Sequence, residues 1–160
     1  AETAGRLQHP NIVTIFDAGE EHDLAYIAME FLPGHDLQAH TRPGTLLPPN
    51  EVLAIAEQVA LALDHAHRQN VVHRDIKPAN VMLDPASGQV KVTDFGIARI
   101  TDSSRTKTGV VLGTPSFMAP EQLAGQRVDG RADLYALGAM LFQLLTGELP
   151  LKGDSLSALM

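Results

Sequence analysis

Apolar residues recur along the chain in patterns typical of short strands in some segments. The runs NIVTIFDAG (11–19) and LAYIAMEFL (24–32) are rich in β-branched and aromatic residues and are separated by the polar stretch EEHD, so we expect an antiparallel pair of strands. The shorter runs NVMLD (80–84) and VKVTD (90–94) flank the turn PASGQ and predict a second hairpin. Both strands of this second hairpin end at a carboxylate.

Two longer segments have the spacing of helices. The segment EVLAIAEQVALALDHAHRQ (51–69) predicts a long helix with Asn50 as its N-cap. The apolar run from 132 to 146 predicts a second helix that stops at Gly147. Between them, residues 97–120 are rich in Ser, Thr, Gly and Pro and are expected to form a loop. The expected apolar stripe of the first helix consists of Leu53, Ala56, Val59, Ala60 and Leu63.

Composition narrows the class of protein. The 160 residues are 44% hydrophobic and 19% charged, which is typical of a globular chain of about one domain. The net charge of −7, without any run of Lys or Arg, argues against a nucleic-acid partner. No apolar stretch approaches the ~18 residues of a membrane span. The lack of Cys excludes disulfides and thiolate metal sites and suits a reducing compartment, so we expect a cytoplasmic location.

The two ends of the sequence both look like interrupted helices. Ala1, Ala4 and Leu7 recur at helical spacing from the first residue, and the closing GDSLSALM starts a helical pattern. We therefore expect the chain to be a piece of a longer domain.

The stretch VVHRDIKPANVMLD (71–84) places several ionisable side chains and one Asn between two apolar runs. If a strand starts near its end, the preceding loop can direct Asp75, Lys77 and Asn80 into one cleft beside Asp94. Taken singly, these would be turn residues or a strand-ending cap. Together, the oxygens of Asn80 and Asp94 suit Mg²⁺, which is usually bound by one or two carboxylates together with substrate phosphates. Asp75 could then accept a hydroxyl proton and Lys77 could stabilise a transferring phosphoryl group, which indicates phosphoryl transfer.

Four motifs stand in one order along the chain: HRDIKPAN (73–80), DFG (94–96), APE (119–121) and DGRADLYALG (129–138). They resemble the catalytic half of a eukaryotic-type serine/threonine protein kinase, and GIAR with GTPSFMAPEQ is similar to the bacterial branch. The resemblance implies an α+β, protein-kinase-like fold. Residues 1–32 would be the end of the small lobe and the hinge, and residues 33–160 the first, mainly helical part of the large lobe.

The resemblance also implies roles for individual residues, with ATP and Mg²⁺ as cofactors and protein Ser/Thr hydroxyls as acceptors. Asp75 would be the catalytic base, Lys77 would contact the γ-phosphate, and Asn80 and Asp94 would bind the metal. A second set would bind the nucleoside: Met29 as gatekeeper, Glu30 and Leu32 through hinge backbone groups, Asp36 near the ribose and Met82 under the adenine. Met29 and Met82 could instead be plain core residues.

Regulation is implied by Arg74, which in this family pairs with a phosphorylated residue of the loop between DFG and APE. Thr114 is expected to contact Asp75 and Lys77, and Phe117 stands where the family usually has Tyr. A solvated polar loop remains the alternative. The loop's candidate phosphorylation sites are Ser103, Ser104, Thr106 and Thr108.

Other residues are expected to be structural. The resemblance gives this role to His73 and Phe95, and it makes Asp133 a buried anchor that accepts backbone hydrogen bonds from the HRD turn, although a surface position is the alternative. It also implies that Glu121 lacks its usual arginine partner, which belongs to later helices. His65 and His67 are two residues apart on a helix and face different directions, so a structural role is favoured over a metal site.

Three parts that the family uses to hold ATP are not found in the sequence: the Gly-rich loop, the strand lysine and its helix glutamate. The position where the family has this glutamate falls one residue before Ala1, so Glu2 is not assigned to that role. The main interpretation is a piece of a serine/threonine kinase, and the alternative is an inactive, pseudokinase-like binding module. For the chain alone we expect little activity and a tendency to associate through exposed strand edges.

Overall fold

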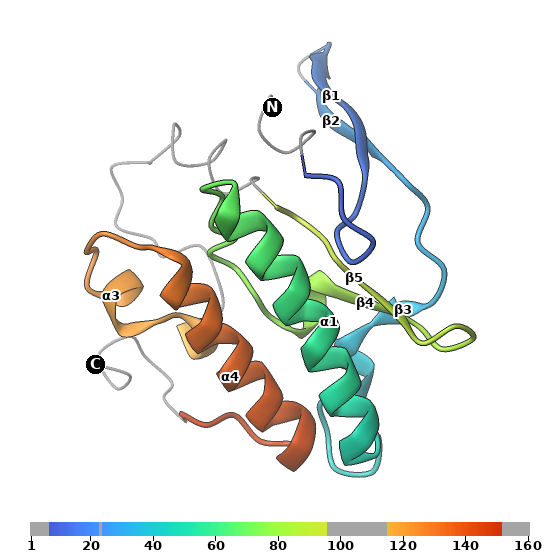
Figure 1. Ribbon diagram of the computed structural model, residues 1–160, viewed down its shortest axis with the longest axis vertical. Coiled ribbons are helices and arrows are strands. Elements are labelled where there is room, and N and C mark those ends of the chain that lie inside the picture. The colour runs from blue at the N-terminus through green and yellow to red at the C-terminus, as the bar shows by residue number, and fades with distance from the viewer. Residues whose placement is uncertain (1–6, 23, 96–114, 152–160) are drawn as a thin grey trace.

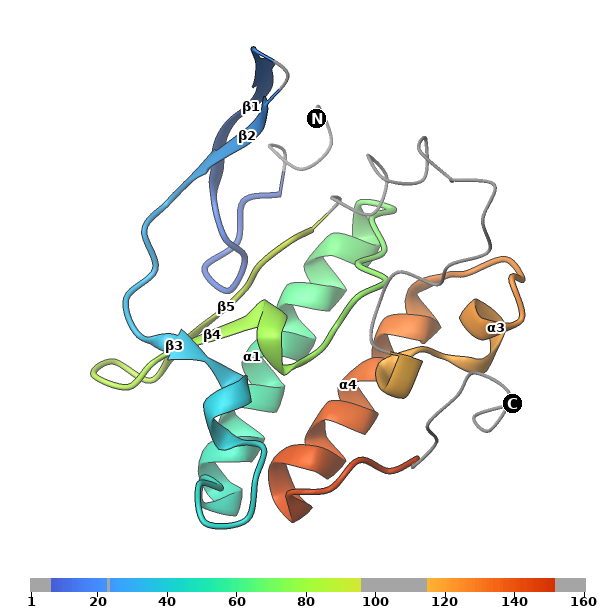
Figure 2. The same cartoon turned by 180° about the vertical axis from the view of Figure 1, so that it is seen from behind.

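The computed structural model describes residues 7–22, 24–95 and 115–151. Helix α1 (Pro49–Arg68) packs against helix α4 (Gly130–Thr146) and also against strand β5 (Gln89–Val92). Figure 1 shows the two helices side by side, with the β1–β2 hairpin extending away from them. Figure 2 shows the same arrangement from behind, where the short strands β3 and β4 lie next to β5.

The first hairpin confirms the expected antiparallel pair but has different bounds. Strand β1 (Ile15–Glu21) pairs with β2 (Leu24–Met29). The first strand was expected to begin at residue 11, and this is wrong because Ile12 and Val13 pair with the other sheet. Ile12 forms a parallel bridge with Val92, and the N–H of Val13 donates to the Val92 carbonyl at 3.0 Å.

The second sheet has the order β3–β4–β5 and confirms the hairpin around PASGQ. Strand β4 (Val81–Asp84) is its central strand, and the two-residue strand β3 (His35–Asp36) was not expected. The chain enters β3 through Gly34, whose φ is 93°. A Cβ at Gly34 would lie 2.0 Å from the carbonyl oxygen of Leu83, so only glycine fits there.

Helix α1 begins one residue before the expected cap. Its first residue is Pro49, and the carbonyl of Pro48 accepts the N–H groups of Glu51 and Val52, so Asn50 lies inside the helix. Proline is favoured at this first position because it needs no N–H partner there. The expected N-cap at Asn50 is therefore wrong.

The expected apolar stripe of α1 is only partly right. Val59 and Leu63 are buried, but Leu53 is 62% exposed and Ala60 is exposed as well. Apolar residues occur on several faces of this helix, so spacing alone did not select the face that packs. The buried residues of α1 are Val52, Ile55, Val59, Ala62, Leu63 and Ala66.

Helix α4 confirms the second expected helix. The carboxylate of Asp129 accepts the N–H of Arg131 at its start, and Gly147 ends it with a φ of 76°. Just before α4, the chain forms the short turn η4 (Pro115–Phe117) and the one-turn helix α3 (Pro120–Leu123). The remainder of the expected loop, and the two expected terminal helices apart from Leu7, lie outside the described residues.

One hydrophobic core joins these elements. It takes large, fully buried side chains from both helices and from the β3–β4–β5 sheet, so the loop between α1 and β4 rests on a packed base. Within the described ranges, no helix is both long enough and apolar enough to cross a membrane. The largest fully buried apolar side chains of the hydrophobic core include Phe95, Ile12, Leu37, Leu63, Ile76, Met140 and Leu144.

Candidate active site

The loop between α1 and β4 brings Asp75, Lys77 and Asn80 together. The Nζ of Lys77 lies 2.8 Å from Oδ2 of Asp75. The Nδ2 of Asn80, in the short turn η3 (Pro78–Asn80), donates to the Asp75 carbonyl oxygen at 2.7 Å and to Asp75 Oδ2 at 3.1 Å. The Asp75 carboxylate therefore has a fixed orientation with a cation beside it.

Asp94 follows β5 and enters the same region. The N–H of Thr93 donates to the carbonyl of Asn80 at 2.9 Å, which ties the chain before Asp94 to the turn that carries Asn80. Asp94 therefore directly follows a residue that is hydrogen-bonded to the loop carrying Asp75 and Asn80. Asp94 has a φ of 64°, a left-handed conformation that Asp tolerates better than most residues.

His73 is a buried support under the loop. Its Nε2 lies 2.7 Å from the Thr93 carbonyl, which can only accept, so Nε2 carries the proton. Its Nδ1 accepts the N–H of Asp75 at 3.2 Å, and its ring meets Phe95 edge-on at 4.6 Å. Burial lowers the pKa of His73, although the hydrogen bond to Thr93 and the nearby carboxylates act in the opposite direction. The neutral ring thus links Asp75 to the segment that leads into Asp94.

Asp133 of α4 fixes the backbone of the same turn. It is 1% exposed; its Oδ2 accepts the N–H of His73 at 2.9 Å and its Oδ1 accepts the N–H of Arg74 at 2.7 Å. These are the hydrogen bonds that an anchor would make. The Nε2 of His67 also lies 2.7 Å from Oδ2. Arg74 has a φ of 69°, a conformation that costs a non-glycine residue on the order of 1 kcal/mol or more and persists only where the surroundings impose it.

Gln122 of α3 is a contact that the sequence did not reveal. Its Nε2 donates to the carbonyl of Arg74 at 2.9 Å, while its Oε1 accepts the N–H of Ala119 at 3.1 Å. The peptide groups on both sides of Arg74 are therefore held, one by Asp133 and one by Gln122. No spacing or motif in the sequence pointed to this role.

Phe117 and Glu121 lie in η4 and α3, just before α4. Phe117 is buried in η4. Glu121 is half-buried, and its charge reaches Arg131, whose pKa is raised mainly by the hydrogen bond with Asp129. The expected regulatory positions Thr106, Thr108 and Thr114, with Ser103, Ser104 and the unassigned Glu2, lie outside the described residues.

The two histidines at the end of α1 have separate partners. His67 contacts Asp133, whereas His65 lies 2.8 Å from the side-chain nitrogen of Gln69 and stacks near His9. Their nitrogens do not converge, as the helical spacing indicated. Across the described ranges, no group of three or more His, Cys, Asp or Glu side chains is arranged to hold a metal ion.

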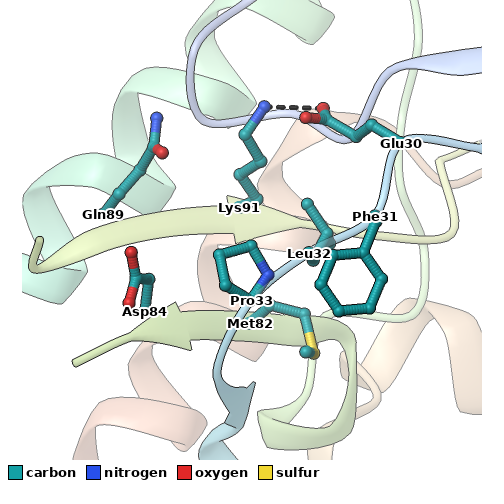
Figure 3. Close-up of a pocket in the computed structure, with 8 residues that line it drawn as sticks. All are labelled: Glu30, Phe31, Leu32, Pro33, Met82, Asp84, Gln89 and Lys91. Carbon is teal, nitrogen blue, oxygen red and sulfur yellow. Dashed lines mark hydrogen bonds and ion pairs between the residues drawn. The ribbon is translucent and has the colours of Figure 1, made fainter. Parts of the chain in front are cut away.

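A pocket lies between the segment after β2 and the β4–β5 hairpin (Figure 3). Three of the expected nucleoside-binding residues line it: Glu30, Leu32 and Met82. Met29 and Asp36 are not among its lining residues. Asp36 pairs with Met82 across the sheet, and its carboxylate accepts the N–H of Gln38 at the start of the 3-10 turn η2 (Leu37–His40). The full lining consists of Glu30, Phe31, Leu32, Pro33, Met82, Asp84, Gln89 and Lys91.

An ion pair crosses one end of this pocket. The Nζ of Lys91 on β5 lies 2.6 Å from Oε1 of Glu30, as the dashed line in Figure 3 shows. The same oxygen accepts the N–H of Thr14 at 2.7 Å. Burial raises the pKa of Glu30, but the hydrogen bonds from Lys91 and Thr14 together outweigh it and leave the pKa below its usual value. Glu30 thus joins three segments, and no pattern in the sequence indicated Lys91 as its partner.

Known proteins match the chain over almost its whole length. The sequence model of the protein kinase domain matches residues 1–159. The chain is 47% identical over 156 residues to the serine/threonine-protein kinase PrkC of Bacillus subtilis, covering 97% of this chain and 24% of that protein. It is 50% identical over 154 residues to PknJ of Mycobacterium tuberculosis, covering 94% of this chain and 26% of that protein.

Solved structures give the same fold. The kinase domain of Mycobacterium tuberculosis PknI aligns with a TM-score of 0.76 at 40% identity, covering 98% of this chain and 60% of that one. Rad53 1-466 in complex with AMP-PNP aligns with a TM-score of 0.80 at 27% identity, covering 99% of this chain and 39% of that one. The chain spans about a quarter of the length of the curated relatives named above. The expected kinase-like α+β fold is confirmed, and the chain belongs to the protein kinase domain family, as part of a domain whose curated relatives are bacterial serine/threonine kinases.

Proposed function

We propose that the domain carrying this chain transfers the γ-phosphoryl group of ATP to Ser and Thr hydroxyls of proteins. The observation that carries the proposal is that the side chains of Lys77 and Asn80 both bond to Asp75, while Asp94 follows Thr93, whose N–H donates to the Asn80 carbonyl. Family membership supports the class of reaction.

Asp75 is the proposed base. Its carboxylate is fixed by Asn80 and Lys77, so it can be aimed at a hydroxyl in a single orientation. Lys77 lies against the same carboxylate and is half-buried, so its charge is close to where negative charge would develop on a phosphoryl group. The Nδ1 lone pair of His73 accepts the N–H of Asp75 and burial lowers the pKa of this ring, so His73 serves as a support and not as the base.

Asn80 and Asp94 are the proposed Mg²⁺ ligands. The Nδ2 of Asn80 is committed to Asp75, which leaves its amide oxygen as the atom that could serve a cation. Asp94 supplies a carboxylate from the neighbouring strand end. Oxygen donors of this kind fit Mg²⁺, which would neutralise phosphate charge when bound.

The nucleoside is assigned to the region between the hinge segment and the β4–β5 hairpin. Glu30 and Leu32 would contact adenine through their backbone, Met82 would lie beneath it, Met29 would border it, and Asp36 would lie near the ribose. The pocket around Glu30, Leu32 and Met82 supports this placement. The 1–32 and 33–160 lobe division and the cytoplasmic location are further parts of the proposal.

Regulation would act through Arg74. Its backbone is fixed on both sides by Asp133 and Gln122, so its side chain starts from a defined position beside the base. A phosphate on Thr106 or Thr108 would bring about −1.5 to −2 charges and could pair with it. For the 160-residue chain alone we predict little phosphoryl transfer. The reason is that the sequence holds no Gly-rich loop and no strand lysine to bind ATP.

The proposal is tested by titrating Mg²⁺-ATP into the full kinase domain with Asp94 replaced. The variant is Asp94→Asn, because Asn also tolerates the left-handed backbone at this position, so the change removes the charge without straining the backbone. We expect Mg²⁺-dependent ATP affinity to fall at least tenfold. Asp64→Asn, an exposed change on α1, should leave it unaltered. Equal Mg²⁺-ATP affinity in Asp94→Asn and the parent would refute the metal assignment.

A further inference from the structure

Two histidines converge outside the proposed active site. The Nε2 of His35, in β3, lies 2.8 Å from the Nε2 of His40, in η2. Their rings are 5.0 Å apart between centroids and are tilted by 49°. Both side chains are half-buried, so the pair is reachable from solvent.

The hydrogen bonds fix which nitrogen of His40 can bind a ligand. Its Nδ1 lies 2.9 Å from the carbonyl oxygen of Thr45. A carbonyl only accepts, so Nδ1 carries the proton and the lone pair of the neutral ring is on Nε2. Metal-bound histidines in proteins are usually held in this way, with the second ring nitrogen donating to a backbone carbonyl or a carboxylate. His40 therefore has the second contact of a metal ligand already in place.

We propose that His35 and His40 form a two-histidine site for a divalent transition-metal ion, with Zn²⁺ as the ion. In the metal-free state the N–H of His35 Nε2 donates to His40 Nε2. When the ion binds, it takes the place of that shared proton, and the proton moves to Nδ1 of His35, so the neutral ring changes tautomer without net charge. Zn–N bonds of about 2.0–2.1 Å in a tetrahedral arrangement require the two nitrogens to be roughly 3.3–3.4 Å apart. The pair has to open by only about half an ångström, which ring rotation can supply.

The backbone around the pair is held in place. Strand β3 pairs with β4 through His35–Leu83 and Asp36–Met82, and Leu37 between the two histidines is fully buried. The ligands therefore start close to their bound positions, which reduces the entropic cost of binding. In the part of the chain that the structure describes, no further His, Cys, Asp or Glu completes a set of three, so water would fill the remaining positions. Such a site is open and binds more weakly than a four-ligand structural site.

The test uses the full kinase domain, purified without a histidine tag, and titrated with ZnCl₂ by calorimetry in the absence of nucleotide. We expect one Zn²⁺ equivalent whose affinity falls at least tenfold in His35→Gln and in His40→Gln. The matched control is His65→Gln: His9 and His65 have the same centroid separation of 5.0 Å, but His9 Nδ1 accepts the N–H of Asn11 and His65 Nε2 contacts Gln69. This control should keep the Zn²⁺ affinity of the parent.

Two further readouts separate metal binding from a mere hydrogen bond. Co²⁺ in place of Zn²⁺ should give an absorption band that is lost in both His35→Gln and His40→Gln. Zn²⁺ should also raise the Tm of the parent and not that of His40→Gln. Equal Zn²⁺ affinity in the parent and both variants would overturn the proposal. It does not rest on phosphoryl transfer, so an inactive domain that binds Zn²⁺ through this pair would still support it.

Discussion

The carboxylate of Asp133 in α4 accepts the backbone N–H of His73, sixty residues earlier in the chain, at 2.9 Å. The second carboxylate oxygen accepts the N–H of the next residue, Arg74. A single side chain of a helix thus fixes two consecutive peptide groups immediately before the proposed base, Asp75. The position of the reactive loop is therefore set from the helical core beneath it.

The first prediction is that Asp133→Asn destabilises the domain by about 1–3 kcal/mol. Two backbone N–H groups bind different oxygens of Asp133, so the amide must present its NH₂ to one of them, and each buried donor left without a partner costs about 1–3 kcal/mol. Urea unfolding of the two proteins measures the difference. Asp64→Asn, which breaks only an exposed pair with Arg68, should change stability by less than about 0.5 kcal/mol. A similarly small effect for Asp133→Asn would rule out the anchor.

The second prediction compares two glycines of the same helix. A Cβ at Gly130 would lie 2.7 Å from Nδ1 of His67, and His67 is held by its contact with Asp133. Gly130→Ala is therefore expected to lower stability by about 1–3 kcal/mol. Nothing lies within 4 Å of a Cβ at Gly138, so Gly138→Ala should raise stability by about 0.5–1 kcal/mol through helix propensity. Thermal unfolding of both variants tests the difference in sign, and a stabilising Gly130→Ala would contradict the contact.

The third prediction concerns acid stability and His73. Burial lowers the pKa of His73 below 6.5, so the unfolded chain binds a proton there more readily than the folded one. The contribution of neutral His73 to the free energy of unfolding is complete above about pH 6.5. It is lost as the pH falls below this value, by up to about 1.4 kcal/mol per pH unit. In His73→Phe this slope should be shallower, with a residual part from His9, whose pKa burial also lowers. Denaturant unfolding between pH 5 and 8 measures the slope; an unchanged slope would mean that His73 titrates normally.

The fourth prediction concerns the ion pair at the pocket. Glu30 and Lys91 have side chains only 24% and 16% exposed, and their charged atoms are 2.6 Å apart. A double-mutant cycle with Glu30→Gln and Lys91→Met should give a coupling free energy of about 1 kcal/mol. Because the pKa of Glu30 is lowered, this contribution is present above its unfolded pKa and fades as acid protonates Glu30. Additive effects of the two changes would show that the pair contributes nothing.

The elements that the sequence predicted well are those whose signals are local. Gly147 ends α4 because its left-handed backbone suits glycine, and the PASGQ turn gives the β4–β5 hairpin. The face of α1 was less predictable: apolar residues such as Leu53 lie on more than one side, and only the packing against α4 and β5 decides which are buried. In the same way, Ile12 looks like part of a continuous strand, but its partner Val92 is distant in sequence.

In the candidate site, too, local contacts were predictable from the sequence and contacts with distant residues were not. The close spacing of Asp75, Lys77 and Asn80 in one loop made their convergence predictable. The supports of that loop come from elsewhere: Gln122 contacts the carbonyl of Arg74 from α3, and no periodicity signals such a contact. The left-handed backbone of Arg74 was also not predictable, because the sequence holds no glycine there and the conformation is imposed by tertiary hydrogen bonds.

The most direct test of the central claim is the rate of phosphoryl transfer by Asp75→Asn in the full kinase domain. Asn preserves the size of the side chain but cannot accept the hydroxyl proton, so kcat is expected to fall by a factor on the order of 10² to 10⁴ while ATP affinity changes little. The measurement follows phosphate incorporation into a Ser/Thr-containing protein, with Asp64→Asn as the control. A kcat for Asp75→Asn equal to that of the parent would contradict the assignment of Asp75 as the base.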